Sequence, residues 1–290
     1  MILLKKIAFL AIIIISISSY SQEEMILDDR VSGEFKSVTL INTQTSKSVP
    51  LKSFELNVQH RFGKADLKND FMKNFLGFDL SSNIRLGFSF PITKDLYVGI
   101  GRTNYNRLVD ADAKYTFLHQ TEDDRVPVFG AFYTSMFART YDLPSMKLYD
   151  STFFYKTSHR FSYFNQIIVS RKFSNNFSAL AAPAIIYRNL VEANEKNTTF
   201  ILPMGGRLKT TFQTSVLFEY TYIHNKIAGN DDIFAISYEI ATAGHGFQIV
   251  FSNNNFISAP YLYSTESVNP LNGQFFIGFN IHRTFFLNKK

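Results

Sequence analysis

Apolar and polar residues alternate from Phe78 to Phe90, in the order Phe-Asp-Leu-Ser-Ser-Asn-Ile-Arg-Leu-Gly-Phe-Ser-Phe. Successive side chains of an extended strand point to opposite faces, so one face of this stretch is apolar and the other polar. An ordinary strand runs about 5–6 residues, whereas a strand that crosses a membrane needs about 9–11. The pattern recurs from Phe275 to Phe286. It predicts an all-β chain that forms a single antiparallel transmembrane β-barrel.

The N-terminus has the layout of a signal peptide for export. A short basic stretch, Met1 to Lys6, is followed by an apolar run from Ile7 to Ile17 and a small polar end at Ser18–Ser21. The apolar run is shorter than the roughly 20 residues of a membrane-spanning helix. We therefore predict a cleaved signal peptide at residues 1–21, a periplasmic or lumen-plug segment at 22–52, and a barrel at 53–290.

Composition agrees with a bacterial outer-membrane location. The chain has no cysteine, which excludes disulfides and thiolate chemistry. The net charge is +6, or 6 − 2 = +4 without Lys5 and Lys6, and its scattered cations do not predict nucleic-acid binding. Phe (31 residues) and Tyr (15 residues) are abundant, and barrels place aromatic residues at both membrane interfaces. Since a membrane sheet needs every backbone group paired, the sheet must close.

About twelve strands can be placed by alternation. Their expected ranges are 53–62, 77–90, 95–103, 111–120, 126–137, 160–173, 176–188, 198–209, 212–224, 232–243, 246–254 and 274–287. Short links alternate with mostly longer, polar ones, as periplasmic turns alternate with outer loops in bacterial barrels. The direction of the side chains is clear for the first, second, ninth, eleventh and twelfth strands. It is ambiguous for the fifth to seventh, where both faces are apolar.

Alternate positions along a strand face the same side of the sheet. This alternation, here called strand parity, places a set of polar side chains inside the barrel. Both signs of charge occur in it, which predicts ion pairs and hydrogen bonds rather than a ring of one sign. The predicted lumen network is Glu55, Arg61, Asp79, Arg85, Lys114, Glu219, Glu239 and Asn280. Within it, we expect Arg61 and Asp79 to pair across neighbouring strands.

Catalytic and metal-binding patterns are weak. The six histidines have no metal-ligand spacing. Asp231-Asp232 near His224 is the best acid–base candidate at the outer rim, and it is better explained as a charged loop. We therefore predict no catalytic residue, no metal and no cofactor.

Several short motifs, in this order along the chain, resemble a family of uncharacterised outer-membrane β-barrel proteins from diderm bacteria. The motifs are His60-Arg61-Phe62-Gly63, Gly77-Phe78-Asp79, Gly99-Ile100-Gly101-Arg102, Arg160-Phe161-Ser162-Tyr163, Arg171-Lys172-Phe173, Arg188-Asn189-Leu190-Val191, Gly244-His245-Gly246-Phe247-Gln248 and Gly278-Phe279-Asn280-Ile281-His282-Arg283-Thr284-Phe285. The resemblance implies a barrel and an outer-membrane address, with no assigned reaction or ligand. The chain departs from the usual barrel ending by adding Leu287-Asn288-Lys289-Lys290 after its last aromatic pair.

Barrel size limits the functions to be expected. Eight strands give a filled interior and sixteen to eighteen an aqueous channel, so twelve predict a narrow or plugged pore for small solutes. The alternative is a non-enzymatic scaffold or surface-binding barrel that acts through its loops at 138–159 and 255–273, and an outer-membrane hydrolase is least favoured. The expected partners are outer-membrane lipid and lipopolysaccharide, the barrel-insertion machinery and an unidentified envelope protein.

Overall fold

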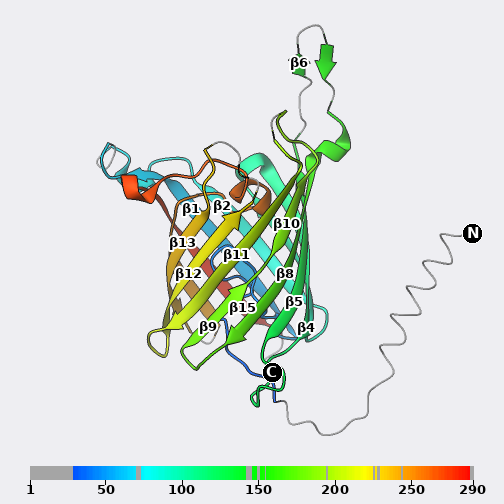
Figure 1. The fold of residues 1–290 in the computed structure, drawn as a ribbon, viewed down its shortest axis with the longest axis vertical. Coiled ribbons are helices and arrows are strands. Elements are labelled where there is room, and N and C mark those ends of the chain that lie inside the picture. Colours follow the sequence, from blue (N-terminus) through cyan, green and yellow to red (C-terminus); the bar gives the residue numbers. More distant parts are fainter. Residues whose placement is uncertain are drawn as a thin grey trace, which may run out of the picture. The chain divides into compact units, whose positions relative to one another are not determined.

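A computed structural model describes residues 29–69, 73–141, 146–148, 151–153, 155–193, 195–224, 226, 229–242 and 244–287. By its internal contacts the chain divides after Arg30, and residues 31–290 form one compact unit, which is a barrel (Figure 1). The predicted signal peptide, residues 1–21, lies outside the described residues.

One antiparallel sheet closes on itself to make the barrel wall. Its strands are β1 (Ser53–Asp66), β2 (Asn83–Pro91), β3 (Leu96–Thr103), β4 (Leu108–Leu118), β5 (Phe129–Arg139), β8 (Phe161–Lys172), β9 (Phe177–Ala181), β10 (Ala184–Arg188), β11 (Thr198–Lys209), β12 (Thr214–Ile223), β13 (Ile233–Ala241), β14 (His245–Ser252) and β15 (Gln274–Phe286). Closure comes from β1, which pairs with both β2 and β15. The predicted all-β barrel is confirmed.

The wall has twelve strands, because β9 and β10 are two halves of one. Both halves pair with β8 on one side and with β11 on the other, so the 13 named strands make 13 − 1 = 12. Pro183, which has no backbone N–H to donate, interrupts the hydrogen bonding between them. The carbonyl groups still pair: Ile167 N donates to Pro183 O at 3.0 Å.

The outer face of the wall is a band of half-exposed apolar side chains. In water such a continuous surface would drive association, and in a bilayer it faces hydrocarbon. Examples from around the barrel are Phe88, Ile100, Phe132, Ile167, Phe200, Phe218, Ile236, Ile249 and Phe251. No helix within the described ranges is long and apolar enough to cross a membrane.

Most links sort by length between the two ends of the barrel. The exceptions are the periplasmic link between β4 and β5, at 119–128, which was predicted to be shorter, and the outer link between β3 and β4, at 104–107. Links at 92–95, 173–176, 210–213 and 242–244 are short, and they lie at the end where β1 begins and β15 ends. We call this the periplasmic end. The opposite end carries longer links, including the one between β5 and β8, where β6 (Met146–Leu148) and β7 (Ser151–Phe153) form a hairpin beyond the barrel (Figure 1).

The second predicted strand starts later than expected. Residues 78–82 alternate in sequence yet lie in turns, and β2 begins only at Asn83. Leu76 and Gly77 both have positive φ, 57° and 84°, which turns the chain away from an extended path. The Phe78 ring packs on Phe62 of β1, with centroids 4.2 Å apart. This contact explains why an apolar residue precedes the strand.

Candidate functional site in the barrel lumen

Residues 31–50, here called the lumen segment, lie inside the barrel. Val31 N donates to Gln120 O at the periplasmic end, at 2.8 Å. The segment then reverses direction at residues 39–44, where Leu40 N donates to Thr43 O and Thr45 N to Val38 O, each at 2.8 Å. Most of its residues are buried by the wall. The sequence predicted a periplasmic or lumen-plug segment at residues 22–52, and the described part from Val31 lies in the lumen.

The tip of the lumen segment is held by one carboxylate. The consecutive backbone N–H groups of Ile41, Asn42 and Thr43 donate to Oε2 of Glu219 on β12, at 3.3, 3.0 and 3.0 Å. Three donors converging on one anion make a backbone anion-binding nest. Glu219 is 2% exposed, so this arrangement compensates a buried charge.

Side-chain amides of the wall bind the carbonyl groups of the same turn. Gln248 donates to Leu40 O at 2.9 Å, and Asn280 donates to Ile41 O at 3.0 Å. The backbone at this turn has no sheet partner, so wall side chains supply the pairing that buried peptide groups require.

The returning half of the lumen segment is bound in the same way. Lys114 donates to Thr45 O at 2.6 Å and Thr116 to Ser46 O at 2.9 Å. The hydroxyls of Ser46 and Ser170 are 2.7 Å apart. Lys114 is fully buried, and its ammonium lies 4.9 Å from the ring centre of Tyr97.

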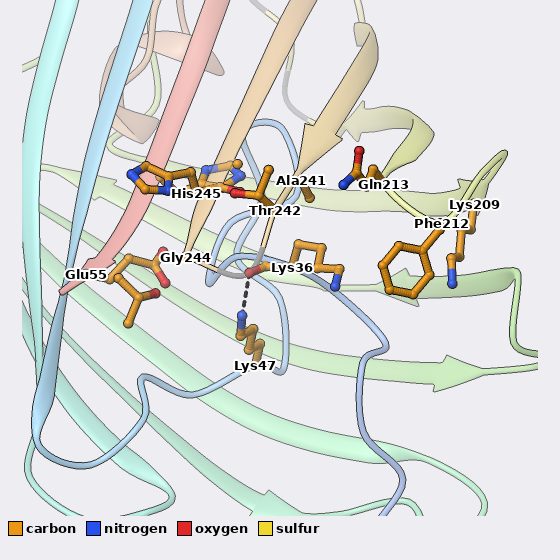
Figure 2. Close-up of a pocket in the computed structure, with 13 residues that line it drawn as sticks. Lys36, Lys47, Glu55, Lys209, Phe212, Gln213, Ala241, Thr242, Gly244 and His245 are labelled. Atoms are coloured by element: carbon orange, nitrogen blue, oxygen red, sulfur yellow. Dashed lines mark hydrogen bonds between the residues drawn. The ribbon is translucent and has the colours of Figure 1, made fainter. Parts of the chain in front are cut away.

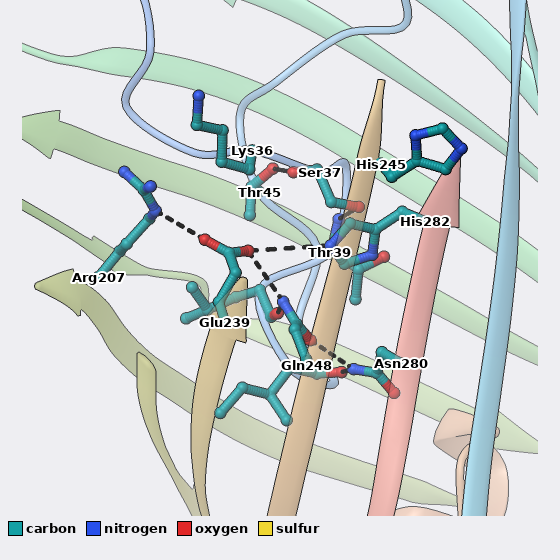
Figure 3. Close-up of polar contacts among 12 residues, drawn as sticks. Lys36, Ser37, Thr39, Thr45, Arg207, Glu239, His245, Gln248, Asn280 and His282 are labelled. Carbon is teal, nitrogen blue, oxygen red and sulfur yellow. Dashed lines mark hydrogen bonds and ion pairs between the residues drawn. The ribbon is translucent and has the colours of Figure 1, made fainter. Parts of the chain in front are cut away.

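Charged and amide side chains of β11, β13, β14 and β15 bind one another on the inner face of the wall. Arg207 donates to Glu239 at 3.0 Å, Gln248 donates to the other Glu239 oxygen at 3.3 Å, and Asn280 donates to Gln248 at 2.7 Å (Figure 3). Arg61 donates to Asn280 at 2.8 Å. The lumen therefore carries ion pairs and amide contacts rather than a ring of one charge.

The outer half of the lumen is closed by residues 253–268, here called the outer loop. It includes the short helix α2 (Ala259–Leu262) and turns inward, burying Leu262 and Tyr263. The hydroxyls of Ser258 and Thr103 are 2.9 Å apart, and Arg139 donates to the Tyr261 hydroxyl at 2.8 Å. A cavity of about 50 Å³ separates the outer loop from the lumen segment.

Apolar contacts join these parts on one side of the lumen. Phe35, Leu40 and Ile41 of the lumen segment belong to one buried cluster with Leu262 and Tyr263 of the outer loop. Inward residues of β4, β5, β8 and β9–β14 complete the cluster. This explains the ambiguous parity of the fifth to seventh strands: their lumen face is apolar where it meets the lumen segment and the outer loop.

Six of the eight residues predicted for the lumen network are buried inside the barrel: Glu55, Arg61, Lys114, Glu219, Glu239 and Asn280. A seventh, Arg85, is half-buried and pairs with Asp110 on β4, with Nε donating to Oδ1 at 3.1 Å. Asp110 was assigned to a link in the sequence, because the predicted strand began one residue later. Asp112, two residues further along β4, and Arg207, which pairs with Glu239, were not predicted either, although the alternation along their strands could have identified both.

The prediction for Asp79 was wrong. It lies exposed in the turn before β2, and the residue opposite Arg61 on β2 is Asn83. Arg61 instead donates to Asn280 and, at 3.0 Å, to Asn42 of the lumen segment. The error follows from the late start of β2, because parity holds only within a strand.

The acid–base candidate at the outer rim has a structural role. Burial opposes ionisation of Asp232, but hydrogen bonds from Ile223 N, the Tyr220 hydroxyl and Lys226 lower its pKa. These contacts fix the link between β12 and β13. No group of three or more His, Asp or Glu residues is placed to hold a metal within the part of the chain that the structure describes.

A second, larger pocket opens at the periplasmic end. It has a volume of about 470 Å³ and lies between the lumen segment and the wall (Figure 2). We call it the mouth pocket. Its lining includes Lys36 and Lys47 of the lumen segment, Lys209 and Glu55 of the wall, and His245 and His282.

A closed twelve-strand barrel with an apolar outer band and a polar lumen is an outer-membrane β-barrel. The family model described as "Membrane bound beta barrel domain (DUF5777)" matches residues 35–285, and the chain belongs to this family. The predicted resemblance and the bacterial outer-membrane location are thereby confirmed. No curated protein matches the chain.

Solved porins and channels are among the structures similar to this chain. The NanC porin superposes with a TM-score of 0.52 at 7% identity, covering 79% of this chain and 98% of that chain. An outer-membrane channel from Pseudomonas putida F1 gives 0.49 at 11% identity, covering 83% and 98%. The KdgM porin gives 0.49 at 8% identity, covering 80% and 99%. At these identities the NanC similarity supports the fold alone.

Proposed function

We propose that this protein is a non-enzymatic pore for small solutes, closed at rest by the lumen segment and the outer loop. The observation that carries the proposal is the way the lumen segment is held. Its turn is bound to the wall through hydrogen bonds that it donates to Glu219 and accepts from Gln248 and Asn280. Each such bond contributes only about 0.5–1.5 kcal/mol net, or about 1.5–3 kcal/mol to a charged group, because water can replace it.

Displacement of the lumen segment would expose polar side chains of the wall to water. The side chains released from it are carboxylate, amide, ammonium and hydroxyl groups on β1, β4, β12, β14 and β15. Burial of Phe35, Leu40 and Ile41 favours the closed state. A closed state held partly by polar contacts that water can replace fits a gated pore better than a permanently filled scaffold.

The scaffold remains the second candidate, and one observation favours it. The β6–β7 hairpin extends the link between β5 and β8 beyond the barrel (Figure 1). The other long link, at 255–273, turns inward instead, so a surface-binding role would rest on residues 138–159.

Solute flux into liposomes tests the pore directly. We expect the full-length protein to admit small sugars slowly, and a variant lacking residues 31–50 to admit them at least about tenfold faster. The double variant Gln248→Ala/Asn280→Ala keeps every residue of the segment and should give an intermediate rate. Barrel folding of each variant is checked by its heat-dependent migration on a gel. Equal, background flux for three folded proteins would reject the pore and leave the scaffold.

A further inference from the structure

The mouth pocket carries an excess of positive charge. Three lysines line it, Lys36, Lys47 and Lys209, against one lining carboxylate, Glu55. Glu55 accepts a hydrogen bond from Ser37 at 2.9 Å. Arg207, just beyond the pocket, is already paired with Glu239.

The lysines come from both parts of the protein that meet at the pocket. Lys36 and Lys47 belong to the lumen segment, and Lys209 lies at the end of β11 (Figure 2). Burial and the nearby charges of Arg207 and Lys47 lower the pKa of Lys36. Lys36 therefore repels Arg207 and Lys209 across the gap between segment and wall, whereas the Lys47 ammonium donates to Lys36 O within the segment (Figure 2).

A buried histidine adds an unused polar group. His282 of β15 lines the pocket and is 5% exposed, and its Nδ1 has no hydrogen-bond partner among the described residues. Its Nε2 lies 3.8 Å from a Glu239 oxygen, which is an ion-pair distance when the ring is protonated but too long for a hydrogen bond (Figure 3). The ring fits because residue 246 is glycine: a Cβ there would lie 2.3 Å from Cδ2 of His282.

We infer that the mouth pocket binds a small anion that carries a carboxylate or a phosphate. Lys36, Lys47 and Lys209 would pair with its charge, and the His282 ring would hydrogen-bond it. A volume of about 470 Å³ suits one small solute and is within the usual range of ligand pockets. As the solute class of the pore, this inference rests on the proposed function, but binding itself does not require conduction.

Calorimetric titration of the full-length protein in neutral detergent tests the inference. Inorganic phosphate and citrate are the probes, and glucose is the neutral control. We expect both anions to bind and glucose not to bind. The double variant Lys36→Gln/Lys209→Gln should weaken phosphate binding by at least about 100-fold, since each of the two charged hydrogen bonds contributes about tenfold or more.

Two further variants distinguish binding in the mouth pocket from a general attraction of anions to a positively charged protein. His282→Gln should weaken binding by about 5-fold or more through loss of the imidazole. Lys94→Gln is the matched control, because Lys94 is an exposed lysine in a short link at the same end but outside the pocket. Phosphate affinity in this control should change less than twofold. An absence of binding, or equal loss in Lys94→Gln, would overturn the inference.

The phosphate could also belong to a lipid headgroup. A short-chain phosphatidylglycerol, titrated below its micelle concentration, distinguishes the two sources. Phosphate binding as tight as lipid binding supports a free solute, whereas lipid binding more than tenfold tighter would overturn that assignment. Because these titrations need no current, anion binding without solute flux would reject the pore alone, and flux without binding would reject the pocket alone.

Discussion

At the scale of single residues, Glu219 is the contact on which docking of the lumen segment depends most. Its Oε2 accepts three backbone N–H groups, from residues 41–43. Parity alone placed Glu219 inside the barrel, but its partners could not be predicted. They are peptide groups of a segment without strand periodicity, and such groups leave no pattern in the side chains.

We expect Glu219→Gln to weaken docking by about 1–3 kcal/mol, because the charged acceptor is lost while the side-chain shape is kept. Trypsin can report this change, since Lys47 lies half-buried in the docked segment. Cleavage there should become about 5- to 100-fold faster than in the unsubstituted protein. Glu122→Gln, at an exposed residue of the link between β4 and β5, is the control and should leave the rate unchanged. Equal rates in all three proteins would show that the carboxylate does not hold the segment.

Glu34 gives docking a dependence on pH. Burial raises the pKa of its carboxyl group above the ordinary 4.5, against the opposing effect of Lys47, Lys114 and Lys172. A raised pKa in the docked state means that this contribution to docking is complete below about pH 4.5. It is lost as pH rises through the raised value.

The predicted outcome is that the docked segment of the unsubstituted protein loosens from pH 5 to pH 8 relative to Glu34→Gln. The ratio of the two tryptic cleavage rates at Lys47, taken at each pH, cancels the pH dependence of the protease. We expect the ratio to rise with pH, because only the unsubstituted protein must bury a charge. A ratio that stays constant would contradict this role for Glu34.

At the scale of the elements, β11 is shaped to let the lumen segment pass. A Cβ added at Gly205 would lie 2.6 Å from Cδ2 of Leu40 and 2.7 Å from Phe218 O. We expect Gly205→Ala to cost about 1–3 kcal/mol of overpacking, measured as a lower midpoint of urea unfolding.

Two comparisons test the origin of that cost. Leu40→Ala should restore part of the lost stability in the double variant, because it removes one of the two close contacts. Gly244→Ala is the matched control, since a Cβ there meets only Thr284 O at 3.8 Å. If Gly244→Ala lost as much stability as Gly205→Ala, the cost would come from replacing a glycine in general and not from the close contacts at Gly205.

The strands themselves could be predicted from the sequence, since hydrocarbon on one face and a wet lumen on the other impose a period of two. The alternation placed all twelve, with β2 begun too early because Phe78 packs in a turn. The outer loop could not be predicted to turn inward. Its buried apolar residues, Leu262 and Tyr263, are adjacent and follow no strand alternation, and their burial depends on a cavity that exists only after closure.

At the scale of the whole molecule, the lumen is closed from both ends by parts that are not barrel strands. Ser46 of the lumen segment and Ser170 of β8 allow this closure to be controlled, because their hydroxyl oxygens are 2.7 Å apart. The chain has no cysteine, so Ser46→Cys/Ser170→Cys would carry the only two thiols. Two sulfurs so placed are close enough to form a disulfide that ties the segment to the wall.

The current through this double variant in a planar bilayer is the most direct measurement. We predict no channel openings in the oxidised protein, and stepwise openings in the same membrane after a reductant is added, because the segment can then leave the wall. The same currents before and after reduction would show that residues 31–50 do not gate the barrel. Silence in both states would contradict the pore itself.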